Sequence, residues 1–318
     1  MPENMNTTLD GARYKFIDEY SEENGRILGF CSEMQLKIMI ESECLHMDGT
    51  FKSCPSLFGQ LYIIHGYYRG ECMPLCYILM TRRLSSSYSA VFRKLKLCAL
   101  EIDPRGLNPM MIITDYEAAV MRAVRDEFPH TSHYGCFFHY VQALFRWIKD
   151  NHLLAQFNED RNFRENFVLK TMIALIPSPV IHRVSNEIDI MYPAPESFVN
   201  YYQSNWVTKA SMITCFPRIT TRTNNVSEGY NSAFNSSIGG SKYNLWAFLL
   251  KLRTEEKYIT IRKERLDYGE PRKAQKIAFI KRNENLVLWK ENLLATDDEI
   301  DFIYQLRILR RFFGPTQI

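Results

Sequence analysis

The segment CLHMDGTF, residues 44–51, sets the pattern for the fold: a short apolar run interrupted by one aspartate. Two further apolar runs follow closely, GQLYIIHGYY at residues 59–68 and MPLCYILM at residues 73–80. The runs are rich in Ile, Leu and Tyr, and Pro, Gly and Ser, which favour turns, separate them. The pattern predicts three strands of an antiparallel meander.

The chain beyond this meander alternates between helical and strand patterns. Apolar residues recur at helical spacing over residues 85–103, and a short run at 109–114 suits a strand that is buried on both faces. A helix, a short strand at 131–135 and another helix follow. This order predicts an α/β fold, a mixed sheet with helices on its faces.

The sequence pattern changes after this region. Two Pro-rich breakers, Pro177-Ser178-Pro179 and Pro193-Ala194-Pro195, divide a stretch that otherwise has only helical patterns. We expect five parts: an N-terminal helical and polar segment (1–43), the first part of the core (44–150), a helical insertion (151–217), helices that complete the core (218–266) and a charged helical tail (267–318).

Composition bounds the class of protein. The 318 residues are 46% hydrophobic and 24% charged, values typical of a globular chain with a large core. The formal net charge of +3 permits nucleic-acid binding but does not argue for it. The eight cysteines form no CxxC pair, and no apolar run approaches the roughly 20 residues that cross a bilayer. We therefore expect a soluble intracellular protein with reduced thiols.

Two aspartates stand where strands carry chemistry. Asp48 interrupts an apolar strand, and burying a bare carboxylate is costly unless it is paired, coordinated or open to a cleft. An edge-strand or turn aspartate before Gly49 is the alternative. Asp115 follows the strand at 109–114 and precedes a helix, where α/β sheets place ligand groups. Its alternative is a helix cap, with Thr114 and Glu117 spaced as in a capping box.

A third acid, Glu228, ends the block TNNVSE at residues 223–228. Asn225 with Glu228 three residues later resembles a cap arrangement. On a helical projection Glu228 falls opposite the apolar face, together with Asn231 and Asn235. That polar face is compatible with lining a polar cleft and with facing solvent, and helical periodicity does not distinguish the two.

Four blocks carry a family resemblance: DGTF at 48–51, ITDYEAA at 113–119, CFFH at 136–139 and TNNVSE at 223–228. In this order and with these gaps, the chain resembles Mutator-like element (MULE) transposases from about residue 40 to about residue 265. The resemblance implies a ribonuclease-H-like fold with an all-α insertion before the last catalytic helix. It also implies an acidic triad of Asp48, Asp115 and Glu228, and a Cys-x-x-His pair of Cys136 and His139.

The implied activity is that of a DDE-type DNA transposase, which cleaves and transfers DNA strands during cut-and-paste transposition. Two Mg²⁺ or Mn²⁺ ions about 3.5–4 Å apart serve such chemistry, and carboxylates are suitable ligands. By family analogy Asp48 bridges the ions, while Asp115 and Glu228 each bind one. The implied partner is double-stranded DNA, as transposon ends and target, in the nucleus. Homo-oligomerisation is compatible with this activity.

The segment around the Cys-x-x-His pair raises the question of zinc. His130, His133, Cys136 and His139 recur every three residues, and zinc prefers such ligands. The segment changes from strand to helix midway, so the four side chains should not share one face, and we do not expect zinc. We expect a buried structural pair, or a contact of His139 with the active site or DNA.

Two further observations leave alternatives open. Residues 251–290 carry 12 Lys and Arg against 6 Asp and Glu, which fits a DNA-tracking surface and equally a solvated helical face. Before Asp48 the chain has no Cys/His spacing of a zinc-binding DNA module. The alternative function is therefore a domesticated or decayed transposase descendant that binds DNA or regulates transcription without catalysis. The intact triad argues mildly against decay.

Overall fold

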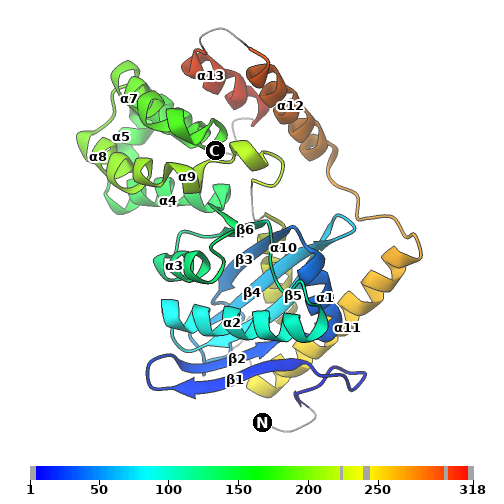
Figure 1. Cartoon of the computed structure of the whole chain (residues 1–318). Helices are drawn as coiled ribbons and strands as arrows, with labels where there is room; N and C mark the ends of the chain where they lie inside the picture. The colour runs from blue at the N-terminus through cyan, green and yellow to red at the C-terminus, as the bar shows by residue number, and fades with distance from the viewer. Residues whose placement is uncertain (1–4, 223–224, 239–243, 297–299, 314–318) are drawn as a thin grey trace. The chain divides into compact units, whose positions relative to one another are not determined.

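The computed structural model describes residues 5–222, 225–238, 244–296 and 300–313, and within residues 225–238 the side chains of 229–236 only. One seven-stranded sheet organises the first part of the chain, in the order β1-β2-β5-β4-β3-β6-β7 (Figure 1). Its strands are β1 (Lys15–Ser21), β2 (Gly25–Phe30), β3 (Cys44–Thr50), β4 (Gln60–Tyr68), β5 (Glu71–Met80), β6 (Met111–Thr114) and β7 (Ser132–Gly135). The predicted mixed α/β architecture is confirmed.

The three apolar runs form the meander that the sequence predicts. Strands β3, β4 and β5 pair antiparallel in sequence order, and β6 then pairs parallel to β3. The parallel pairing requires a crossover, which is supplied by the helix α2 (Ser85–Ile102). Both predicted short strands, at 109–114 and 131–135, are present as β6 and β7.

Strands β1 and β2 were not expected, because only a helix was predicted before Cys44. They form an antiparallel hairpin, and β2 extends the sheet by pairing with β5. The register of β1 shifts between Lys15 and Ile17, so the adjacent side chains of Phe16 and Ile17 are both buried. This irregularity, together with the exposed polar end of β1, removes the alternation that signals a strand. The predicted helix near residues 34–40 is present as α1 (Glu33–Glu41).

Helices cover both faces of the sheet. On one face α1, α2 and α3 (Ala118–Glu127) bury one apolar cluster with alternate residues of the strands, among them Leu45, Met47 and Ile64. On the other face lie α10 (Asn225–Ile238) and the first half of α11 (Leu245–Asp267). Their apolar cluster holds the opposite strand residues, including Ile63 and Tyr77. Each strand of the meander is therefore buried on both sides.

The chain divides into two compact units, each described here by itself. Unit 1 comprises residues 1–133 and 224–273, and unit 2 comprises residues 134–223 and 274–318. The α-helices of unit 2 are α4 (Phe137–Asp150), α5 (Leu154–Glu159), α6 (Arg161–Met172), α7 (Ile181–Met191), α8 (Glu196–Asn205), α9 (Ala210–Ile213), α12 (Ile277–Leu294) and α13 (Phe302–Phe312). In neither unit does a described helix combine the length and the apolar character needed to cross a bilayer.

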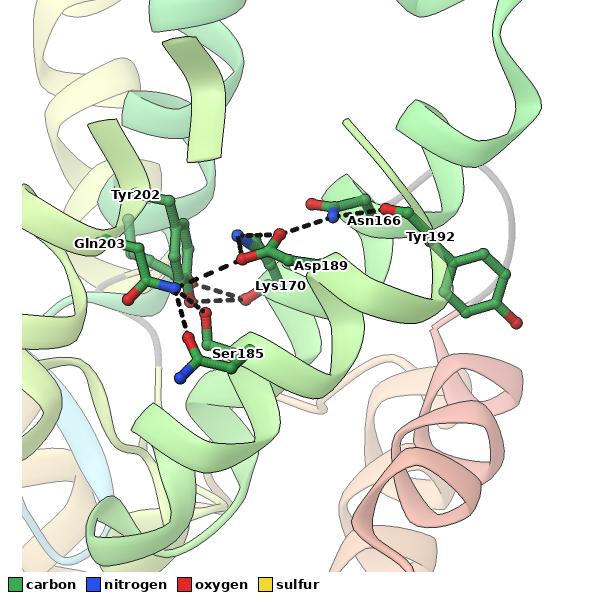
Figure 2. A network of polar contacts seen from close by, with 9 residues as sticks. Asn166, Lys170, Ser185, Asp189, Tyr192, Tyr202 and Gln203 are labelled. Carbon is green, nitrogen blue, oxygen red and sulfur yellow. Dashed lines mark hydrogen bonds and ion pairs between the residues drawn. The ribbon is translucent and has the colours of Figure 1, made fainter. Parts of the chain in front are cut away.

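A buried ion pair organises the core of unit 2 (Figure 2). Lys170 of α6 is fully buried, and its Nζ lies 2.7 Å from Oδ1 of Asp189 in α7. Asn166 donates a 2.9 Å hydrogen bond to the same carboxylate, and the Lys170 Nζ lies 4.2 Å from the centroid of the Tyr202 ring. Burial lowers the pKa of Lys170, although Asp189 opposes that shift. Such a pair ties α6, α7 and α8 to one mutual arrangement.

Candidate active site

The sheet register brings the two predicted aspartates together. In the parallel pair β3·β6, His46 lies opposite Ile113. Two residues further along each chain, this register places Asp48 beside Asp115. Neighbouring strands lie about 4.8 Å apart, so the two aspartates lie at the same end of adjacent strands, Asp48 inside β3 and Asp115 directly after β6. The carboxyl ends of two adjacent parallel strands thus carry two acids side by side.

Asp48 is buried and held by the helix that covers it. Asp48 is 6% exposed. Its Oδ2 accepts a 2.9 Å hydrogen bond from Nδ2 of Asn231 in α10. The other amide atom, Asn231 Oδ1, is buried and has no hydrogen-bond partner among the described residues. The alternative interpretation of Asp48 is wrong, since Asp48 and Gly49 both lie within β3 and β3 is an inner strand between β4 and β6.

Asp115 follows directly after β6 and is partly exposed. Its Oδ1 accepts a 3.1 Å hydrogen bond from the backbone N–H of Glu117. The alternative capping box is wrong: Glu117 is itself the N-cap of α3 and makes no side-chain cap bond, while Thr114 Oγ1 bonds to the Asp115 carbonyl and to His133. The local turn therefore holds Asp115 at the strand end rather than using it as a helix cap.

Glu228, the third predicted acid, lies outside the described side chains. Its backbone belongs to α10, three residues before Asn231. Residues three apart lie on the same side of a helix. Among the side chains that the structure describes, no group of three His, Cys, Asp or Glu is arranged to hold a metal ion. The structure thus brings Asp48 and Asp115 together and gives no side-chain position for Glu228.

A neighbouring carboxyl, Glu117, was quoted in the sequence block but was not assigned to the site. It accepts a 3.3 Å hydrogen bond from the hydroxyl of Tyr88, which also accepts one of 2.6 Å from Gln60. Arg83 lies 3.9 Å from it. Burial, with a smaller contribution from the charge of Asp115, raises the pKa of Glu117. Its partners tie Glu117 to the start of α2 and to β4.

Two histidines behind Asp48 were also missed. His46 and His65 lie opposite each other on β3 and β4. His46 precedes Asp48 by two residues, so the two side chains lie on the same face of the sheet. Burial, and to a smaller extent His46, lowers the pKa of His65 to about 3. The His65 ring packs edge-on against Tyr230 of α10, with 5.4 Å between ring centroids. The His65 ring is therefore neutral near pH 7. The alternation of residues along β3 was the signal that could have placed His46 on the same face as Asp48.

The Cys-x-x-His pair lies at the start of α4, in unit 2. Cys136 is the N-cap residue and is fully buried, whereas His139 is partly buried in the first turn. The His139 Nδ1 has no hydrogen-bond partner among the described residues. His133 lies on β7, in unit 1, where its Nε2 is 2.9 Å from Thr114 Oγ1. His130 is exposed before that strand.

The basic excess of residues 251–290 is largely neutralised in α11. Arg262 is buried between Glu71 and Glu270, at 2.7 and 2.6 Å. Three lysines pair with Glu255, Asp10 and Asp267, and Arg253 donates to two backbone carbonyls. This part of the segment agrees with a solvated helical face with mixed charges and not with an open basic surface.

The fold and the site together define a mixed α/β protein with an acidic pair at the ends of two parallel strands. Residues 44–143 match the sequence model of the MULE transposase domain. The match contains Asp48, Asp115, Cys136 and His139, and it confirms the predicted resemblance to MULE transposases over that stretch. Glu228 lies beyond it.

Other comparisons add little. The Drosophila P element transposase strand transfer complex aligns over 89% of this chain and 68% of that chain, at 10% identity and a TM-score of 0.25. A TM-score this low does not establish a common fold. No curated protein matches the chain.

Proposed function

We propose that this protein is a DDE-type DNA transposase core, which cleaves DNA strands and joins them to a target with the help of divalent metal. One observation carries the proposal: Asp48 and Asp115 each follow by two residues the paired His46 and Ile113 of the parallel strands β3 and β6, within the stretch that matches the MULE transposase domain. Two carboxylates at one sheet edge are poorly explained by stability, because like charges at close range repel each other.

The fold that we propose for the core is ribonuclease-H-like, with a helical insertion between Asp115 and Glu228. The order of elements supports this assignment. The meander β3-β4-β5 is followed by the crossover helix α2 and by β6, which returns beside β3. Helices then occupy the described chain between Phe137 and Arg218.

The donor chemistry of the site fits Mg²⁺ or Mn²⁺. Carboxylate and amide oxygens are the hard ligands that these ions prefer. Asp48 Oδ2 is taken by Asn231, while the buried Asn231 Oδ1 lacks a hydrogen-bond partner in the described chain, as expected of an oxygen awaiting water or a cation. We propose that Asp48, Asp115 and Glu228 would together hold these ions. Bound there, the ions would stabilise charge on the attacking and leaving oxygens of a phosphodiester.

The protein's own residues orient and insulate this site. Asn231 donates a hydrogen bond to one oxygen of Asp48 and so restrains the orientation of this carboxylate. The neutral ring of His65 holds no positive charge that would attract the carboxylates away from a metal. Position 228 lies one helical turn before Asn231, so the contact that anchors α10 over Asp48 also brings the backbone of position 228 to this end of the sheet.

The partner that we propose is double-stranded DNA, as transposon ends and target. A nuclear location and a homo-oligomer accompany this proposal through the resemblance to MULE transposases. A descendant that binds DNA without catalysis is the alternative, and it predicts that DNA binding is independent of Asp48.

Nicking of supercoiled plasmid tests the proposal without knowledge of the terminal repeats. The full chain is incubated with plasmid and Mn²⁺, beside Asp48→Asn, an EDTA control and the matched surface variant Asp126→Asn, whose carboxylate is 46% exposed. We expect nicking by the wild type and by Asp126→Asn, and none by Asp48→Asn or with EDTA. A folded wild type that does not nick, or an Asp48→Asn variant that nicks equally well, would contradict the proposal.

A further inference from the structure

Unit 2 contains a pocket with an unusual concentration of arginine. A cavity of about 450 Å³ opens where α6, the end of α7 and α13 meet. We call it the arginine pocket; its lining residues are Arg161, Asn162, Glu165, Tyr192, Arg307, Arg310 and Arg311. All seven belong to unit 2 and none belongs to the acidic site. Four guanidinium groups face one carboxylate, which leaves a local formal charge of +3.

Helical spacing explains how α13 delivers three of these arginines. Arg310 and Arg311 follow Arg307 by three and four residues, so the three arginines share one face of α13. The apolar residues Leu306 and Leu309 are fully buried and turn the other face of α13 into the core of unit 2. The arginine face of α13 is thus fixed by packing rather than left free to rotate.

Two of the four arginines have partners that hold the pocket together. Arg310 Nη1 lies 2.5 Å from Glu165 Oε2 of α6. Arg307 donates a hydrogen bond to the hydroxyl of Tyr192, and its guanidinium lies 5.8 Å from the centroid of that ring. These contacts join segments that are more than 100 residues apart in the sequence. They form the wall of the pocket.

The remaining two arginines are available to a ligand. Arg161 and Arg311 are exposed, and neither has a carboxylate within ion-pair distance in the described part of the chain. Placing unpaired like charges around one cavity costs stability unless an anion joins them. The pocket therefore combines two fixed guanidinium groups with two that lack a counter-ion.

Stabilisation of helix ends does not account for this arrangement. Cations near the C-terminus of a helix are favourable, which explains Arg310 and Arg311 in the last turn of α13. Arg161, however, is the first residue of α6, at the positive end of that helix. The first amides of α6 are already capped by Asp160, so an anion would be bound by side chains and not by the helix end.

The net positive charge of the chain is also concentrated in unit 2. Unit 2 has 16 Lys and Arg against 13 Asp and Glu, a net charge of +3, whereas unit 1 has 23 of each and is neutral. The whole formal net charge of the protein therefore resides in unit 2. A mildly positive unit with one strongly positive pocket attracts a polyanion and then fixes it at one point.

We propose that the arginine pocket binds phosphate groups of a DNA backbone, as an anchoring site separate from the acidic pair. The planar guanidinium fork donates two parallel hydrogen bonds to a phosphate, and arginine is the residue that best matches this geometry. Asn162 and Tyr192 add polar and aromatic contacts at the rim. The choice of DNA rests on the proposed function, but binding at this pocket needs neither metal nor catalysis.

The test measures the salt dependence of DNA binding by the full chain. A fluorescein-labelled 30-base-pair duplex of arbitrary sequence is titrated in EDTA at several NaCl concentrations, for the wild type and for Arg161→Gln/Arg311→Gln. Each lost phosphate contact lowers the slope of log Kd against log salt by about 0.9. We expect the slope to fall by about 1 to 2 and the Kd at 0.1 M salt to rise about tenfold or more.

A matched control separates the pocket from general charge. Arg146→Gln/Arg183→Gln removes the same charge from exposed positions of unit 2 outside the pocket, and we expect it to leave the slope unchanged. Equal slopes for the pocket variant and the wild type would overturn the inference, as would equal losses in the pocket and control variants. Because the titration is carried out in EDTA, its outcome does not depend on metal binding at the acidic site.

A second arm distinguishes DNA from a small phosphate compound. Inorganic pyrophosphate at millimolar concentration is added to the wild type and to the pocket variant, and the unfolding temperature is recorded. If DNA is the ligand, the pocket variant loses DNA affinity whether or not pyrophosphate stabilises the wild type. If pyrophosphate stabilises only the wild type while DNA affinity is the same in both proteins, the pocket serves a free phosphate compound and the assignment to DNA is wrong.

Discussion

The two units of this protein place charge in opposite ways. In unit 1 the charges balance, and two like charges, Asp48 and Asp115, are set side by side by the register of a parallel strand pair. In unit 2 the balance is positive, and four arginines converge through the packing of helices α6 and α13. Backbone hydrogen bonds therefore fix the acidic pair, whereas side-chain contacts between remote segments fix the arginine pocket.

This difference determines how each unit should respond to mutation. A strand register tolerates the loss of one side chain, because the backbone pairing remains, so variants of the acidic pair should lose activity and keep their fold. A helical unit ordered by a buried ion pair depends on that pair, so a single change there should cost stability. The predictions below test this contrast.

The largest effect is expected at the acidic pair, where Asp115→Asn is compared with Glu117→Gln. Asp115→Asn should lower the rate of plasmid nicking at least about 1,000-fold, as removal of one member of a catalytic set commonly does. Glu117→Gln should lower it less than about threefold, because Glu117 makes a partly exposed ion pair with Arg83. Initial nicking rates in Mn²⁺ give both values. Equal losses would mean that the acidic site is not centred on Asp48 and Asp115.

A large loss of stability is expected in unit 2 from Asp189→Asn. This change leaves the ammonium of Lys170 buried without its counter-charge, which should lower the free energy of unfolding by about 3–5 kcal/mol. Adding Lys170→Met should restore most of that loss. Urea unfolding followed by tryptophan fluorescence measures it well, because three of the four tryptophans belong to unit 2. A single variant as stable as the wild type would contradict this account of the core.

A smaller effect on activity is expected from Asn231→Ala, which removes the hydrogen bond to Asp48. Partners that orient metal ligands commonly contribute 10–100-fold to activity or metal affinity, so nicking should fall by about that factor. The Mn²⁺ concentration for half-maximal nicking should rise in parallel. Ser232→Ala, at the neighbouring exposed position of α10, is the matched control and should behave like the wild type. An unchanged Mn²⁺ requirement in Asn231→Ala would show that Asn231 does not position Asp48.

The last effect is seen only below neutral pH and concerns acid stability and the buried ring of His65. Its pKa falls from the usual 6.5 to about 3 in the folded protein, so the unfolded chain takes up a proton first. Stability from this residue is complete above pH 6.5 and is lost as the pH falls toward 3, by about 1.4 kcal/mol per pH unit. His65→Leu should flatten the pH dependence of unfolding in that window. Parallel profiles for the two proteins would argue against a neutral His65.

Much of the site was predictable because its positions follow from strand periodicity and from the family blocks. The run at residues 44–51 predicted β3, and the run at 109–114 predicted β6, which ends directly before Asp115. The pairing that brings them together was not visible in either run, because register depends on which strands become neighbours. Asn231 was seen as polar, but its contact with Asp48 depends on how α10 packs.

Other features could not be predicted for physical reasons. Strands β1 and β2 were missed because a register shift places Phe16 and Ile17 both in the core and breaks the alternation. The arginine pocket was missed because its residues lie on segments that are far apart in the sequence. The basic excess at 251–290 drew attention instead, although α11 neutralises much of it with partners such as Glu71.

The central claim is that Asp48 and Asp115 hold divalent metal together. Fe²⁺ can replace Mg²⁺ at oxygen ligands, and with ascorbate and peroxide it cuts the backbone next to its site. We expect cuts that map close to residues 48 and 115, that excess Mg²⁺ suppresses and that disappear in Asp48→Asn. Cuts that map elsewhere in the chain, or that persist unchanged in Asp48→Asn, would contradict it.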